Sequence, residues 1–159
     1  MNLSPITALT PLDGRYSNKL TDLRPYFSEY ALIRHRVFVE VEWLKALSFA
    51  PEIAEVPPFS EHTLKELDDL FAHFSESDAE AVKQIESKTN HDVKAVEYWL
   101  KERLKGNAEV AKVSEFLHFS CTSEDINNLA YALMVKSARK AVMLPELRKI
   151  SEKLREMAQ

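Results

Sequence analysis

Three short segments of the sequence combine side chains that could bind an anion or move a proton. The first is Asp13-Gly14-Arg15-Tyr16, a turn signal followed by a guanidinium and a phenol. Arg15 offers a planar fork that suits phosphate or carboxylate, and Tyr16 adds a hydroxyl and a ring face. The same four residues are also typical of an ordinary surface turn. Both interpretations stay open at this point.

The second segment, Thr89-Asn90-His91-Asp92, interrupts a helical pattern. Thr89 or Asn90 could cap the helix that follows, and Asp92 would complement its dipole. A functional role would add to this cap, because free backbone N–H groups at a helix start bind anions. His91 could donate a hydrogen bond there or move a proton near neutral pH.

The third segment is His118-Phe119-Ser120-Cys121-Thr122-Ser123-Glu124-Asp125. Thr122 or Ser123 would cap a long helix whose first turn is acidic. His118 precedes this helix start, although a lone histidine is more often a core or surface residue. Cys121 could be a nucleophile or a small buried hydrophobe.

Together the three segments indicate a pocket for a small polyanion. We expect no metal site, because the five histidines show neither H-E-x-x-H nor paired cysteine spacing. We also expect no cofactor. The chain has only 2 glycines, Gly14 and Gly106, where an average usage of about 7% would give roughly 11. A glycine-rich phosphate loop therefore cannot be built, and an all-β fold is disfavoured.

The spacing of apolar residues predicts the helices that must position these segments. Residues 1–27 contain three prolines and are expected to be irregular. Helical periodicity then runs from Ser28 to Pro51, resumes after a Ser60 cap, and resumes again after Ser77, which has capping-box spacing with Glu80. A further helix should begin near Asp92 and end at Gly106, and a shorter one should carry Val110, Val113 and Leu117.

The last predicted helix starts after Thr122 or Ser123 and keeps its apolar spacing to Met157, with Pro145 as a kink or junction. No cap or closing turn precedes Gln159, and an apolar stripe of this length packs along helices of similar length. We therefore expect a fragment cut inside a bundle helix. The predicted fold class is all-α, a small N-terminal helical domain followed by the start of a long-helix bundle.

Charge and composition exclude several classes of protein. The formal net charge of −4 disfavours a nucleic-acid partner. A single cysteine cannot form an internal disulfide, which fits a reducing compartment. We expect no secretory signal, and no apolar run approaches the roughly 20 residues of a membrane helix. We expect a cytoplasmic, soluble protein with no membrane partner.

The segments also carry a family resemblance. D-G-R-Y, T-N-H-D-V-K-A-V-E-Y and H-F-x-C-T-S-E-D-I-N-N, in this order, resemble the N-terminal region of bacterial adenylosuccinate lyases, in the fumarase and aspartase superfamily. The T-S-x-D form after H-x-x-x is similar to this lyase rather than to argininosuccinate lyase or fumarase. The resemblance extends through almost all 159 residues.

The resemblance implies an all-helical homotetramer whose active sites are each assembled from three subunits. Its reactions would be the elimination of fumarate from adenylosuccinate, giving AMP, and from the succinyl-carboxamide ribotide intermediate of purine biosynthesis. Residues 1–110 would form the N-terminal domain and residues 111–159 the beginning of the central bundle. The family's catalytic R-T-H and S-S-x-M-P-x-K-x-N motifs are absent from this sequence, so we expect the fragment alone to be inactive.

The resemblance assigns substrate-binding roles to three groups of residues: Arg15 and Tyr16 at the phosphate of the nucleotide, Asn90, His91 and Asp92 along the substrate, and Thr122 and Ser123 on the succinyl or fumarate carboxylate. His118 would lie near the same pocket. His91 and His118 are implied as possible auxiliary catalytic groups.

Two alternatives remain from the sequence alone. One is another lyase of the same superfamily that acts on a different succinyl or carboxylate substrate. The other is a non-catalytic helical interaction module that binds a partner through the apolar face of its last helix.

Overall fold

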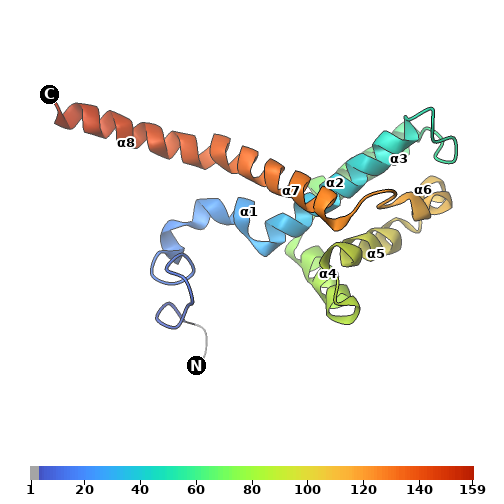
Figure 1. Ribbon diagram of the computed structural model, residues 1–159, viewed down its shortest axis with the longest axis horizontal. Coiled ribbons are helices and arrows are strands. Elements are labelled where there is room, and N and C mark those ends of the chain that lie inside the picture. Colours follow the sequence, from blue (N-terminus) through green and yellow to red (C-terminus); the bar gives the residue numbers. More distant parts are fainter. Residues whose placement is uncertain (1–3) are drawn as a thin grey trace. The chain divides into compact units, whose positions relative to one another are not determined.

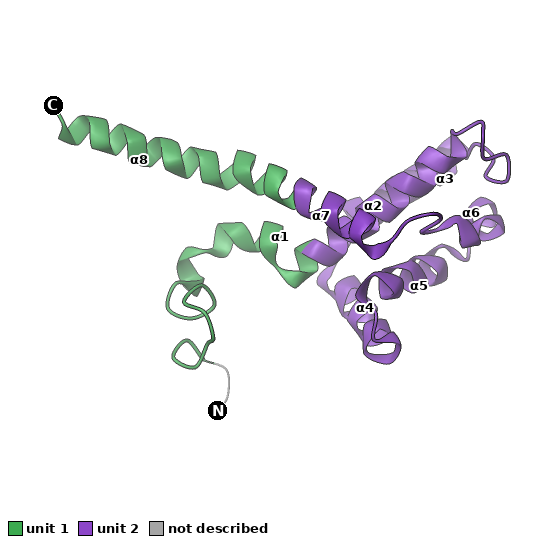
Figure 2. Ribbon diagram, in the orientation of Figure 1, with its two compact units in different colours: residues 1–31, 134–159 green, residues 32–133 purple. Residues whose placement is uncertain are grey.

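A computed structural model describes residues 4–159 of the chain. In this part every regular element is a helix and no β-strand occurs, which confirms the predicted all-α class (Figure 1). The chain divides into two compact units (Figure 2). One unit comprises residues 32–133, and the other comprises residues 1–31 and 134–159. Each unit is described by itself.

Helix α2 (Glu29–Ser48) contributes a continuous apolar stripe to the core of the unit formed by residues 32–133. Its predicted apolar stripe is buried at Ile33, Val37, Val41, Leu44 and Leu47. Helix α3 (Glu61–Ala72) packs beside it, because the Phe38 and Phe71 rings lie 4.7 Å apart between centroids. Helix α2 also buries several charged residues, which apolar periodicity does not predict.

The first turns of α3 and α4 show how local hydrogen bonds set the helix starts. The Ser60 hydroxyl accepts a hydrogen bond from the Thr63 N–H, as predicted for α3. Helix α4 (Glu76–Thr89) instead begins with a capping box between Ser75 and Asp78. The predicted box at Ser77 is therefore wrong. Both serines have the required spacing, but Phe74 is buried against Trp99, and this contact places Ser75 at the start.

Helix α5 (Asp92–Leu104) is followed by Gly106 at the predicted position, although the φ angle of Gly106 is not positive. Asn107 then caps α6 (Ala108–Lys112), and a 3-10 turn, η3 (Ser114–Phe116), follows. The single short helix predicted here is thus divided in two. Its three apolar residues are buried as expected: Val110, Val113 and Leu117.

Helical structure runs without a break from Ser123 to Met157, through α7 (Ser123–Ala138), the π-helical segment η4 (Arg139–Met143) and α8 (Leu144–Met157). Pro145 lies in the first turn of α8, immediately after the π turn. Proline lacks a backbone N–H and its ring collides with the carbonyl four residues earlier. The wider π turn accommodates both effects, so the predicted junction at Pro145 takes this form.

The other unit contains the N-terminal segment and α8. The segment is largely irregular, as predicted, and holds η1 (Ser17–Lys19), η2 (Thr21–Leu23) and the single-turn helix α1 (Arg24–Phe27). Helix α8 exposes apolar side chains along its length: Leu147, Ile150, Leu154 and Met157. Among the described residues, none of the helices has the length and apolar character to span a membrane.

The capping box predicts which serine stabilises α4. Replacement Ser75→Ala removes the acceptor for the Asp78 N–H, and it should lower the free energy of unfolding by about 1 kcal/mol. Replacement Ser77→Ala should change it by less than about 0.5 kcal/mol, as for an ordinary surface position. Urea unfolding of both variants measures the difference. Equal losses for the two variants would contradict the capping assignment.

Candidate functional site

Three polar residues of α2 face the segments that the sequence predicts to be functional. Arg36, Glu40 and Trp43 are spaced four and three residues apart, so they lie on one face of the helix. Arg36 contacts the second segment and the helix that follows the third, whereas Glu40 and Trp43 both contact the third segment. We call these three residues the polar face of α2.

Arg36 connects two helix starts. Its guanidinium donates from Nε to Asn127 Oδ1 of α7 at 2.9 Å, and from Nη2 to Asp92 Oδ2 of α5 at 2.5 Å. The Arg36 side chain is 4% exposed and that of Asp92 is 44% exposed. Burial alone would raise the pKa of Asp92, but the Arg36 charge and the Val93 N–H overcome it and lower that pKa below its ordinary value. The second and third predicted segments are therefore tied together through one buried cation.

In the second segment, the residue that caps α5 differs from the two that the sequence predicted. Asn90 has a left-handed backbone (φ 52°) and ends α4, so it does not cap α5. The cap is His91, whose Nδ1 accepts the Lys94 N–H at 3.1 Å. An accepting Nδ1 carries no proton, so the proton of the neutral ring sits on Nε2. Asparagine tolerates the left-handed region best among non-glycine residues, which explains why it occupies the junction.

The loop before α7 is fastened to the polar face of α2. His118 Nδ1 lies 2.6 Å from Oε1 of Glu40, and the Trp43 indole donates to the Phe119 carbonyl at 2.8 Å. His118 and Ser120 both have positive φ angles, 61° and 59°. Such conformations are costly for these residue types and persist where neighbouring contacts impose them. The loop is thus held in one strained shape by α2.

The start of α7 uses its own acidic residue. The Asp125 carboxylate accepts from both the backbone N–H and the hydroxyl of Thr122, at 2.7 and 2.9 Å. Hydrogen bonds from Thr122 lower the pKa of Asp125. Helix α7 begins at Ser123, in agreement with the prediction that it starts after Thr122 or Ser123. The Thr122 hydroxyl is engaged as a donor here and must be released from Asp125 to donate to a ligand.

Cys121 does not have the environment of a nucleophile. It packs against the cluster formed by Val39, Val93 and Ile126. Burial raises the pKa of its thiol, and the Glu40 charge adds to this effect. Since the thiolate is the reactive form, Cys121 acts as a small core residue in this state.

The first predicted segment lies in the other unit. Gly14 donates to the Thr10 carbonyl and Tyr16 to that of Pro11, which closes a compact turn. A Cβ on Gly14 would lie 2.7 Å from the Pro5 carbonyl oxygen, so the turn requires glycine. The Arg15 guanidinium lies 4.6 Å from the centroid of the exposed Tyr16 ring. A shared site with the residues of α5 and α7 stays a prediction.

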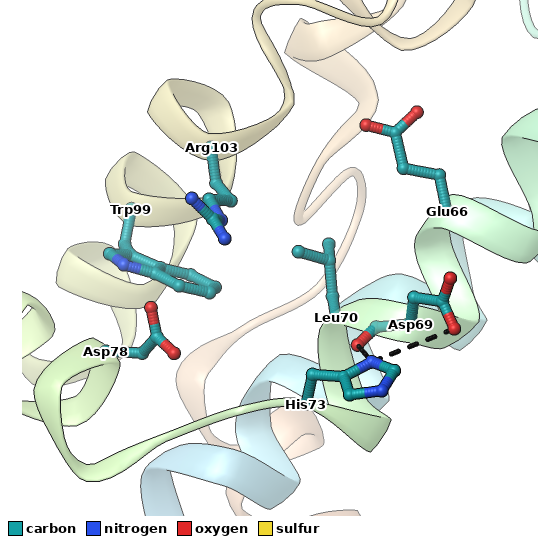
Figure 3. A pocket seen from close by; sticks show the side chains of 7 residues that line it. All are labelled: Glu66, Asp69, Leu70, His73, Asp78, Trp99 and Arg103. Atoms are coloured by element: carbon teal, nitrogen blue, oxygen red, sulfur yellow. Dashed lines mark hydrogen bonds and ion pairs between the residues drawn. The ribbon is translucent and has the colours of Figure 1, made fainter.

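A pocket of about 360 Å³ lies elsewhere, between α3, α4 and α5 (Figure 3). In Figure 3 the α5 residues Trp99 and Arg103 face side chains of α3. The lining contains none of the residues that the sequence singled out: it consists of Glu66, Asp69, Leu70, His73, Asp78, Trp99 and Arg103. Within residues 4–159, no group of His, Cys, Asp and Glu residues could hold a metal ion.

The sequence did not reveal the polar face of α2. Arg36 and Glu40 stand one turn apart, but the same helix also carries charges such as Arg34 and Glu42. No signal in the sequence therefore separates the buried pair from the other charges of α2. Charged residues are almost never fully buried without a partner, and the partners of this pair lie in distant segments that the sequence of α2 does not identify.

Comparison with known proteins gives the class to which this fold and site belong. A family model described as "Lyase" matches residues 14–159. The chain belongs to this lyase family.

Curated relatives show which lyases the chain is similar to. The chain is 54% identical over 159 residues to an adenylosuccinate lyase of Haemophilus influenzae and 51% identical over 159 residues to that of Vibrio cholerae. It is also 52% identical over 158 residues to that of Escherichia coli K12. These matches cover 99–100% of the chain, whereas the chain spans only 35% of the length of each relative.

The Arg36–Asp92 pair predicts a pH-dependent stability. Because the folded-state pKa of Asp92 lies below its ordinary value of about 3.9, the pair stabilises fully above that pH and is lost as the pH falls through the folded pKa. Asp92→Asn should lower the free energy of unfolding by about 1–2 kcal/mol at pH 7. This loss is smaller than the ~3–5 kcal/mol expected when a fully buried ion pair is broken, because Asp92 is nearly half exposed.

Unfolding by urea at a series of pH values between neutrality and pH 3 measures this effect. The stability difference between wild type and Asp92→Asn should shrink at the acid end. Glu102→Gln, which removes an exposed ion pair with Lys105, serves as the control and should differ little from wild type at any pH. A constant Asp92→Asn difference across the range would refute the linkage.

Proposed function

We propose that the chain supplies the N-terminal, substrate-binding portion of an adenylosuccinate lyase. The whole enzyme would eliminate fumarate from adenylosuccinate to give AMP, and from the succinyl-carboxamide ribotide intermediate of purine biosynthesis. Family membership over residues 14–159 supports a lyase, and the names of the relatives support this substrate. The same names favour this reaction over that of another lyase of the superfamily.

The observation that carries the proposal is the bridge made by Arg36. This side chain contacts Asp92 of the T-N-H-D segment and Asn127 of the T-S-E-D-I-N-N segment. Two helix starts, at Asp92 and Ser123, are thereby held by one buried group. Helix starts present free N–H groups that favour anions, which fits a substrate carrying phosphate and carboxylate groups.

This chain would supply only part of the catalytic residues, and the rest would come from motifs that its sequence does not contain. A base takes a proton from Cβ of the succinyl group, the C–N bond breaks with its electron pair moving to nitrogen, and an acid protonates that nitrogen. Donors must also stabilise the carboxylate as charge accumulates on it. We assign the carboxylate contacts to Thr122 and Ser123, and auxiliary roles to His91 and His118.

Further contacts complete the proposed site. Asn90, His91 and Asp92 would line the substrate, and Arg15 with Tyr16 would contact the nucleotide phosphate. The exposure of Tyr16 and the stacking of Arg15 on its ring leave both side chains accessible to a ligand. No cofactor is needed for this elimination.

The proposed assembly is a cytoplasmic homotetramer. Residues 1–110 would belong to its N-terminal domain, and residues 111–159 would begin its central bundle. The exposed apolar side chains of α8 support association with other long helices, since such a stripe is normally covered. The same stripe would serve a non-catalytic interaction module, but a module of that kind has no need of the arrangement around Arg36.

We expect the 159-residue chain by itself to have no lyase activity, because the R-T-H and S-S-x-M-P-x-K-x-N motifs are absent from it. The assay follows the loss of adenylosuccinate absorbance with the purified chain. The Haemophilus influenzae enzyme provides the positive control. Fumarate release by the chain alone would show that the missing motifs are dispensable.

A chimera tests the proposed function directly. In it, this chain replaces the matching segment of the Haemophilus influenzae enzyme, to which it is 54% identical. The chimera should cleave adenylosuccinate, and Arg15→Ala and His91→Ala should each lower its kcat/KM by about 10-fold or more, since each removes a charged or proton-bearing contact. A chimera that assembles but does not turn over would reject the function. Two variants with unchanged kcat/KM would reject the site.

The oligomeric state of each variant, measured by light scattering, separates loss of contacts from loss of assembly. Glu102→Gln offers a matched surface control, because it removes only an exposed ion pair and should keep the activity of the parent chimera.

A further inference from the structure

Glu40 is a buried acid for which neither the proposed reaction nor the core has an evident use. Its side chain is 0% exposed, and Oε2 is the only buried side-chain nitrogen or oxygen atom among the described residues that lacks a hydrogen-bond partner. A buried unpaired oxygen carries a desolvation cost that an apolar side chain of similar volume would avoid. Such a residue calls for an explanation other than packing.

The hydrogen bond between the side chains of Glu40 and His118 supplies that explanation. Oε1 lies 2.6 Å from His118 Nδ1, a short distance that is typical of a charge-assisted bond. His118 forms no other hydrogen bond with the described residues through its side chain, and its Nε2 is not among the buried unpaired atoms. Nε2 is therefore the ring nitrogen that remains accessible.

We propose that Glu40 is a positioning residue of the candidate site, which holds His118 by Nδ1 so that Nε2 faces the substrate. The inference rests on the proposed function only in assigning His118 to the substrate pocket. Glu40 itself cannot touch a ligand, because it is fully buried. It acts by fixing the orientation and the tautomer of the imidazole. Carboxylates that hydrogen-bond to metal-binding histidines act in the same way.

The surroundings of Glu40 are consistent with this role. Burial raises the pKa of Glu40, and the charge of Glu97 adds to this effect, whereas the hydrogen bond from His118 opposes it. The strained φ angle of His118 and the Trp43 bond to Phe119 fix the backbone on which the imidazole stands. With the backbone held by Trp43, the contribution left to Glu40 is the orientation of the ring.

Nitrogen NMR of the histidine rings tests the contact in the chain itself, without reference to activity. In the neutral wild-type ring, Nδ1 of His118 should carry the proton that it donates to Glu40. Glu40→Gln should lower the population of this tautomer, while the other four histidines stay unchanged. Glu97→Gln is the matched control, because Glu97 is also buried but pairs with Lys94 and Lys101. An identical His118 tautomer in wild type and Glu40→Gln would overturn the inference.

The chimeric enzyme tests the consequence for catalysis. Glu40→Gln should lower kcat/KM by about 10–100-fold, by analogy with the loss seen when the hydrogen-bond partner of a metal-binding histidine is removed. Glu40→Asp keeps the carboxylate and should recover part of the loss, whereas Glu97→Gln should stay within about twofold of wild type. Thermal unfolding midpoints of Glu40→Gln and wild type should agree within ~4 °C.

The outcomes separate the two proposals. A chimera that is inactive with Glu40 intact rejects the proposed function, and the tautomer comparison still decides whether Glu40 holds His118. An active chimera whose Glu40→Gln variant keeps full kcat/KM rejects the positioning role and leaves the function in place. A loss of activity without a tautomer change would assign Glu40 a merely structural role, which also overturns the inference.

Discussion

A guanidinium cannot lose its proton inside a protein, so the burial of Arg36 obliges its neighbours to supply oxygen acceptors. Asp92 and Asn127 supply them from two helices far apart in the sequence. One turn further along α2, the opposite charge of Glu40 is also buried and meets His118. Apolar contacts set the distances between helices but tolerate small rotations, whereas these charged contacts have preferred directions. The starts of α5 and α7 are therefore oriented by α2.

Periodicity was sufficient to find the longer helices, because a helix that buries one stripe repeats its apolar residues every three or four positions. It also located the stripe of α2 from Ile33 to Leu47. The finer choices depended on tertiary contacts. Ser75 and Ser77 have the same capping-box spacing, and the burial of Phe74 decided between them. The π turn before Pro145 could be expected as a junction but not as a particular geometry.

The residues of the candidate site were likewise only partly predictable from the sequence. The motifs named Asn90, His91, Asp92, Thr122 and Ser123 because these residue types sit at breaks between helical patterns. The residues that hold these segments in place, Arg36 and Glu40, lie in the middle of a helix, where they resemble ordinary surface charges in the sequence. Which face of a helix is buried depends on partners that a local pattern does not contain. Thr89 or Asn90 was expected to cap α5, but Thr89 is the last residue of α4 and the left-handed backbone of Asn90 ends that helix.

The cap formed by His91 gives the two ring nitrogens separate tasks. Nδ1 accepts the Lys94 N–H and so belongs to the first turn of α5, which leaves Nε2 as the nitrogen through which the neutral ring can donate to a ligand. Loss of a helix cap costs about 1 kcal/mol. A substitution at His91 would therefore weaken the start of α5 as well as remove a donor, so the stability of this helix and the contact to a ligand depend on the same side chain.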